Sequence, residues 1–82
     1  MRHYILHSAT LNTDGELRID CSRPYPTEQE AQAAQYLMLA SYPQQFAYPA
    51  KSWRLEQVGN FARLACSECQ AELQCHVQEL PV

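Results

Sequence analysis

The fold of this chain is decided by residues 52–77, which read SWRLEQVGNFARLACSECQAELQCHV. A Gly59-Asn60 pair separates two runs of mixed apolar and polar residues, and glycine suits a tight hairpin turn because it adopts positive φ without steric cost. From Ala71 onward apolar and polar side chains alternate, as they do in a half-buried strand. We therefore predict three consecutive antiparallel strands.

The turn at Gly59-Asn60 sets the register of the first two strands, and we predict a second two-residue turn at residues 67–68. On this register Arg63 lies between Glu56 and Glu72 on one face of the sheet. The facing pairs on the other face are Trp53 with Cys66, Leu55 with Leu64, Cys66 with Cys69, Leu64 with Ala71 and Ala62 with Leu73. Apolar neighbours on one face and opposite charges on the other are the pairs that stabilise a sheet.

A further hairpin is predicted over residues 3–21, because Asp14-Gly15 is a strong turn signal between two apolar runs. A three-residue loop there gives the pairs Leu11 with Leu17, Ala9 with Ile19 and His7 with Cys21. We expect this matched set to face the core. The alternative, a four-residue loop, would bring Tyr4 and Leu6 to the buried side instead.

A helix is predicted over residues 27–41. Thr27 is a good N-cap, and Glu30 three residues later is typical of a capping box. Pro43 requires the helix to end shortly before it. The expected contact stripe consists of Ala33, Ala34, Leu37, Ala40 and Ser41.

These elements define an α+β fold of order β-β-α-β-β-β, in which one helix packs on an antiparallel sheet. The 82 residues suffice for one small domain. Its segments are the N-terminal hairpin (3–21), the helix (27–41), an aromatic loop (42–51) and a three-stranded meander (52–78). We expect the tail, residues 78–82, to be frayed or loosely docked.

Composition narrows the class of protein. The net charge of -3, without a basic cluster, argues against a nucleic-acid partner held through its phosphates. No apolar run is long enough to span a bilayer, so we expect no membrane association. The chain begins without the pattern of a signal peptide, and its four cysteines then indicate cytoplasmic thiols or metal ligands before disulfides.

Cys66 and Cys69 have the spacing of a zinc knuckle, although a second such pair is missing. If the two hairpins lie together, His7 and Cys21 complete a tetrahedral Cys₃His set for a structural zinc ion. Two alternatives remain. Buried cysteines behave as small apolar residues of the core, and a vicinal pair can also be redox-active.

No catalytic constellation is apparent. Cys75 and His76 are adjacent on a predicted strand, so their side chains face opposite ways and cannot act as nucleophile and base. Both glycines of the chain are assigned to hairpin turns, which leaves no glycine-rich phosphate loop. We therefore expect no enzymatic activity.

The aromatic loop is the strongest functional feature. Tyr42, Phe46 and Tyr48 are candidate anchors for a protein partner, and the alternative is that they close one end of the core. The leading hypothesis is a small non-enzymatic protein-binding module: an adaptor, an inhibitor of the kind that phages or plasmids encode, or a small subunit of a complex. The alternative is a zinc-stabilised, ribbon-like module that contacts nucleic acid through Arg18, Arg54 and Arg63. The residues specify neither the identity of the partner nor the oligomeric state.

Overall fold

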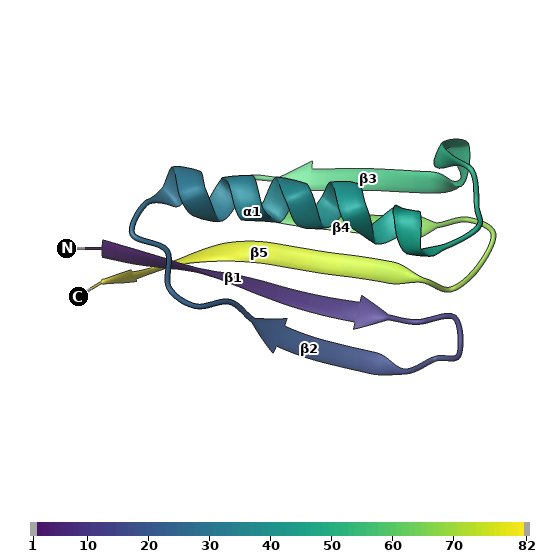
Figure 1. The fold of residues 1–82 in the computed structure, drawn as a ribbon, viewed down its shortest axis with the longest axis horizontal. Helices are drawn as coiled ribbons and strands as arrows, with labels where there is room; N and C mark the ends of the chain where they lie inside the picture. Colours follow the sequence, from purple (N-terminus) through teal and green to yellow (C-terminus); the bar gives the residue numbers. More distant parts are fainter. Residues whose placement is uncertain (1, 82) are drawn as a thin grey trace.

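The computed structural model describes residues 2–81, which form a five-stranded antiparallel sheet with one long helix on one face (Figure 1). The elements are β1 (Arg2–Leu11), β2 (Leu17–Cys21), α1 (Glu28–Ser41), η1 (Tyr42–Gln45), η2 (Ala50–Ser52), β3 (Trp53–Val58), β4 (Phe61–Cys66) and β5 (Glu72–Pro81), where η1 and η2 are 3-10 turns. The predicted α+β class and element order are confirmed. Among the described residues, no helix has the length and apolarity to cross a membrane.

The last strand joins the two hairpins. The strand order is β2-β1-β5-β4-β3, so β5 lies in the middle of the sheet (Figure 1). It pairs with β1 over its whole length, from Glu72 opposite Leu11 to Pro81 opposite Arg2. The expectation of a loosely docked tail is therefore wrong for residues 78–81, and Val82 lies outside the described residues.

Both hairpin registers set by glycine turns are confirmed. In the β3–β4 hairpin Glu56 lies opposite Arg63, and Gly59 has a φ of +56°. In the β1–β2 hairpin His7 lies opposite Cys21, and Gly15 has a φ of +86°. Only glycine adopts such angles without strain, and a turn of fixed length then fixes every pair beyond it.

The predicted β4–β5 register is wrong by two residues. The Cys66 N–H donates to the main-chain oxygen of Ala71 (3.1 Å), and Leu64 faces Leu73 rather than Ala71. The cause lies in the neighbouring strand, because the Ser67 N–H donates to the oxygen of Ser52 (2.7 Å) and so keeps pairing one residue past Cys66. A shift of two residues leaves each side chain on its predicted face.

The core lies between α1 and one face of the sheet. The buried sheet residues on this face are Leu6, Ala62, Leu64, Cys66, Leu73, Cys75 and Val77. The prediction that the paired side chains of the N-terminal hairpin face the core is wrong. Leu17 and Ile19 of this set lie on the face away from α1, where they are 62% and 74% exposed. The reason is the long pairing of β1 with β5, which places Leu6 beside the buried Val77.

The helix begins as predicted but presents a different stripe. The Thr27 side chain accepts a hydrogen bond from the Glu30 N–H (3.2 Å), which confirms the N-cap. Leu37, expected at the centre of the contact stripe, is 66% exposed. The observed stripe on the sheet consists of Ala31, Ala34, Gln35, Met38 and Leu39. The middle of the observed stripe is the buried Gln35, which a prediction that follows the apolar residues of the helix does not include.

Candidate functional site

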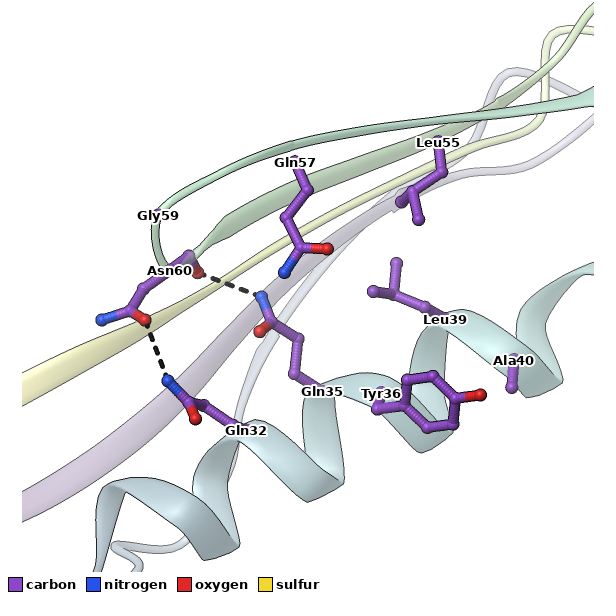
Figure 2. Close-up of a pocket in the computed structure, with 9 residues that line it drawn as sticks. All are labelled: Gln32, Gln35, Tyr36, Leu39, Ala40, Leu55, Gln57, Gly59 and Asn60. Atoms are coloured by element: carbon purple, nitrogen blue, oxygen red, sulfur yellow. Dashed lines mark hydrogen bonds between the residues drawn. The ribbon is translucent and has the colours of Figure 1, made fainter.

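A groove separates α1 from the edge strand β3. The main sheet contacts of the helix are with β1 and β5, and Leu55 of β3 stays 51% exposed although it lies on the helix side of the sheet. Figure 2 shows Leu39 and Leu55 pointing toward one another across this space. The groove has a volume of about 490 Å³, and its walls include Tyr36, Leu39, Ala40, Leu55, Gln57 and Asn60.

One end of this groove is closed by amide hydrogen bonds from the helix to the β3–β4 turn (Figure 2). The Gln35 Nε2 donates to the main-chain oxygens of Asn60 (3.0 Å) and Cys75 (3.3 Å). The Gln32 Nε2 donates to the Glu28 carboxylate (2.9 Å) and to the Asn60 Oδ1 (3.3 Å). Gln35 is only 4% exposed, so these bonds satisfy a buried amide and hold the turn against the helix.

The other end of the groove continues into the aromatic loop. A second hollow, of about 440 Å³, shares Leu39 and Ala40 with the first and is also lined by Phe46, Tyr48 and Trp53. The two hollows therefore adjoin at Leu39 and Ala40, and together they reach from the Asn60 turn to the loop. We call the two hollows together the α1–β3 groove.

Tyr42, one of the three predicted partner-binding residues, lies in the core. It is 5% exposed, and its hydroxyl lies 3.2 Å from the main-chain oxygen of Leu11 and 3.3 Å from that of Glu72. Burial raises the pKa of this phenol. Tyr42 therefore joins the end of α1 to the ends of β1 and β5. It supports the neighbouring rings of Phe46 and Trp53 from inside the core.

Phe46 and Tyr48 have a different placement. Phe46 is partly buried, with its ring centroid 5.1 Å from that of Tyr42 and 5.5 Å from that of Trp53. Tyr48 is 38% exposed. Both line the α1–β3 groove, and their role in partner binding stays a prediction. Beneath them the indole N–H of Trp53 is buried, with no hydrogen-bond partner among residues 2–81.

The lining of the groove carries no ionisable acid or base other than tyrosine, within the part of the chain that the structure describes. One charged residue lies near each end of the groove. Glu28 is bonded to Gln32 beside the Asn60 turn, and Lys51 lies just before β3 at the loop end. A partner that covers the groove therefore removes water from its lining without burying an unpaired charge of the groove.

The four predicted zinc ligands do not come together. Cys66 is on the helix side of β4, where it is buried, and Cys69 lies beside it in the β4–β5 turn. His7 and Cys21 face one another on the opposite side of the sheet, away from α1. Strands that present side chains to opposite faces cannot direct them at one ion. Among residues 2–81, no group of three or more His, Cys, Asp or Glu side chains is placed to hold a metal.

The face away from α1 has its own features. The His7 ring stacks on the His76 ring with centroids 4.7 Å apart, and the His7 Nε2 lies 2.7 Å from the Gln78 Oε1. Nearby, Arg63 forms ion pairs with Glu72 (2.6 Å) and Glu56 (3.6 Å). The hydrogen bond from Arg63 lowers the pKa of the Glu72 carboxyl.

Cys75 and His76 fall on opposite faces of β5, as the alternation predicts. The Cys75 side chain is 1% exposed under α1, and burial raises the pKa of its thiol. His76 points away from the helix, toward His7. This cysteine and this histidine therefore do not form a nucleophile and base pair.

The residue that sequence reasoning missed is Gln35. Its signal is the spacing of Ala31, Gln35 and Leu39, which repeats every four residues and marks one side of the helix.

Comparisons of the chain with protein-family models, with curated proteins and with solved structures found no match. The fold and the groove define the class by themselves: a small α+β domain with an apolar groove between its helix and one edge strand.

Proposed function

We propose that this protein is a non-enzymatic protein-binding module that holds a segment of a partner protein, with no net charge, by inserting its apolar side chains into the α1–β3 groove. The observation that carries the proposal is the exposure of Leu55 and Tyr36, at 51% and 72%, in the lining of one hollow between α1 and β3. Contiguous exposed apolar surface in a recessed site is typical of a binding site.

The aromatic loop supports this proposal at one end of the groove. Phe46 and Tyr48 offer large contact area, and aromatic residues dominate the binding energy of many interfaces. Pro43 and Pro49 restrict the loop that carries them. A restricted loop loses little conformational entropy when a partner binds.

The charge distribution supports a neutral ligand segment. The groove lining is uncharged, while Glu28 and Lys51 lie at opposite ends. An adaptor, an inhibitor and a small subunit of a complex would each use such a surface to hold a partner. We expect this to occur in the cytoplasm, where the four cysteines stay reduced.

The alternative function, a zinc-stabilised module that contacts nucleic acid, has less support. Arg18 pairs with Asp20 (3.4 Å), and Arg63 pairs with two carboxylates on the opposite face of the sheet. Cations that are already paired and point to both faces do not form a continuous surface for phosphates. The placement of the four predicted zinc ligands on opposite faces of the sheet gives the zinc part of this hypothesis no support.

The experiment that tests the proposal compares two aspartate variants of one strand. Leu55→Asp places a charge in the groove, and Val58→Asp places the same charge on the opposite face of β3, where Val58 is 77% exposed. Random short peptides displayed on phage are selected against the wild-type protein, and the selected peptides are then titrated into each variant.

We expect Leu55→Asp to weaken peptide binding by about tenfold or more and Val58→Asp to leave it nearly unchanged. Circular dichroism melts of both variants report on the fold. Failure to select any peptide, or binding that survives Leu55→Asp, would overturn the proposal.

A further inference from the structure

We infer that the partner segment binds as an extended strand that adds to the free edge of β3, with alternate side chains in the α1–β3 groove. This inference rests on the proposed function and specifies the conformation and chemistry of the ligand. It follows from the placement of hydrogen-bonding groups on β3, from the contrast between the two edges of the sheet and from the charges at the ends of the groove.

Within residues 2–81, β3 has no neighbouring strand on its outer side, so its outward backbone groups lie at an open sheet edge. Hydrogen bonds alternate along an antiparallel strand, so every second residue directs its N–H and C=O away from the neighbouring strand. The Ser52 oxygen accepts from Ser67 across the hairpin, whereas the Trp53 N–H donates to Ala50 within its own segment. By this alternation, Leu55 and Gln57 direct their backbone groups outward.

The same two residues line the groove with their side chains. An added strand would therefore bond to the backbone of Leu55 and Gln57 while its own side chains enter the space beside them. Backbone bonds of this kind contribute affinity, and the pockets for alternate side chains contribute specificity.

The two edges of the sheet are not alike. On the other edge strand, β2, the residues Arg18 and Asp20 point to the helix side and form an ion pair (3.4 Å). The hollow between β2 and α1 includes both of these charged side chains. Charges placed in this way discourage association at a sheet edge. On β3 the corresponding positions are Trp53, Leu55 and Gln57, which carry no charge.

These features specify the ligand. An added strand directs every second side chain into the groove, so it should carry apolar residues at alternate positions and polar residues between them. Glu28 beside the Asn60 turn favours a basic residue at that end of the ligand, and Lys51 favours an acidic residue at the loop end. A helical ligand does not fit this pattern, because its backbone groups are paired internally and leave the edge unused.

The test uses the peptides selected against the wild-type protein, each synthesised in two forms. One form is methylated on one alternate set of backbone nitrogens, and the other form on the complementary set. A strand paired with β3 uses only one of these sets, so we expect one form to lose about tenfold or more in affinity and the other to bind nearly as the parent does. No protein variant is needed for this comparison.

A pair of proline variants gives the matching result from the protein side. Gln57→Pro removes an outward N–H of β3, and Ile19→Pro removes the equivalent N–H of β2, since proline is tolerated where the N–H of an edge strand faces solvent. We expect binding to weaken in Gln57→Pro and to persist in Ile19→Pro. Strand addition would be overturned if both methylated forms lost affinity, or if neither did. Selected peptides whose apolar residues are spaced as on a helix would also contradict it.

The two proposals fail in different ways. Peptides that depend on Leu55 but show no preference between the methylated forms would leave the groove as the binding site and remove the added strand. Peptides that bind equally to wild type and to Leu55→Asp would remove both. Binding that is lost in Ile19→Pro but kept in Gln57→Pro would place the strand on β2 and also contradict the inference.

Discussion

The Nε2 atom of Gln35 lies 3.0 Å from the main-chain oxygen of Asn60, which joins the buried side of α1 to the turn between β3 and β4 (Figure 2). This contact spans 25 positions of the sequence and closes one end of the α1–β3 groove. The same amide also bonds to the main-chain oxygen of Cys75 on the central strand. The Gln35 side chain therefore holds the helix both to the central strand β5, which the helix covers, and to the β3–β4 turn at the edge of the sheet.

The first prediction concerns this amide. Gln35→Met keeps the volume but removes the bonds to Asn60 and Cys75, so we expect the free energy of unfolding to fall by about 1–2 kcal/mol. Gln32→Met is the matched control, because the bonds of Gln32 are exposed and should matter much less. Urea unfolding followed by tryptophan fluorescence measures both. Equal stability of the two variants would show that the Gln35 bonds do not hold the turn.

The second prediction concerns pH. The pKa of Glu72 is lowered below its ordinary value of 4.5, chiefly by the hydrogen bond from Arg63. A carboxyl of this kind stabilises the fold above its unfolded-state pKa, and the contribution is lost as the pH falls through the folded-state pKa. We therefore expect wild type to exceed Arg63→Gln in stability near neutral pH, with the difference shrinking below about pH 4. A difference that is constant over this range would contradict the assignment.

The third prediction separates two residues of the aromatic loop. Phe46 packs against Tyr42 and Trp53, so Phe46→Ala should lower the free energy of unfolding by about 2 kcal/mol and also weaken peptide binding. Tyr48 is more exposed, and Tyr48→Ala should weaken binding with little change in melting temperature. The measurements are thermal melts and peptide titrations on the two variants. Unchanged binding in Tyr48→Ala would remove the loop from the interface.

The fourth prediction concerns metal. Because Cys66 and Cys69 are separated by the sheet from His7 and Cys21, we expect purified protein to carry less than about one zinc ion per chain. A strong chelator should leave the melting curve unchanged. Stoichiometric zinc, together with a chelator-dependent loss of the fold, would contradict this arrangement of the sheet.

Local turn chemistry made the hairpins predictable. Gly15 and Gly59 both adopt positive φ, and each fixes the pairs of its hairpin through a turn of a few residues. The four-residue turn after Cys66 was mispredicted, because the pairing of Ser67 with Ser52 depends on the neighbouring strand. Registers that rest on one turn can be predicted from sequence, and those that depend on a third strand require the assembled sheet.

The buried face of β1 illustrates a second limit. Its two sides, with Leu6 on one and Leu11 on the other, are similarly apolar, so the sequence pattern of the strand does not select between them. The choice follows from the pairing with β5, which joins residues 61 to 79 positions apart. The α1–β3 groove has the same origin, because it depends on where the helix lies across the sheet.

Peptide binding in the α1–β3 groove is tested most directly by nuclear magnetic resonance, which maps backbone amide shifts as a selected peptide is titrated into nitrogen-labelled protein. We expect the largest changes at Leu39, Leu55, Gln57 and Tyr48, along the α1–β3 groove. Changes that are centred instead on His7, Ile19 and Phe61, on the face away from the helix, would contradict it.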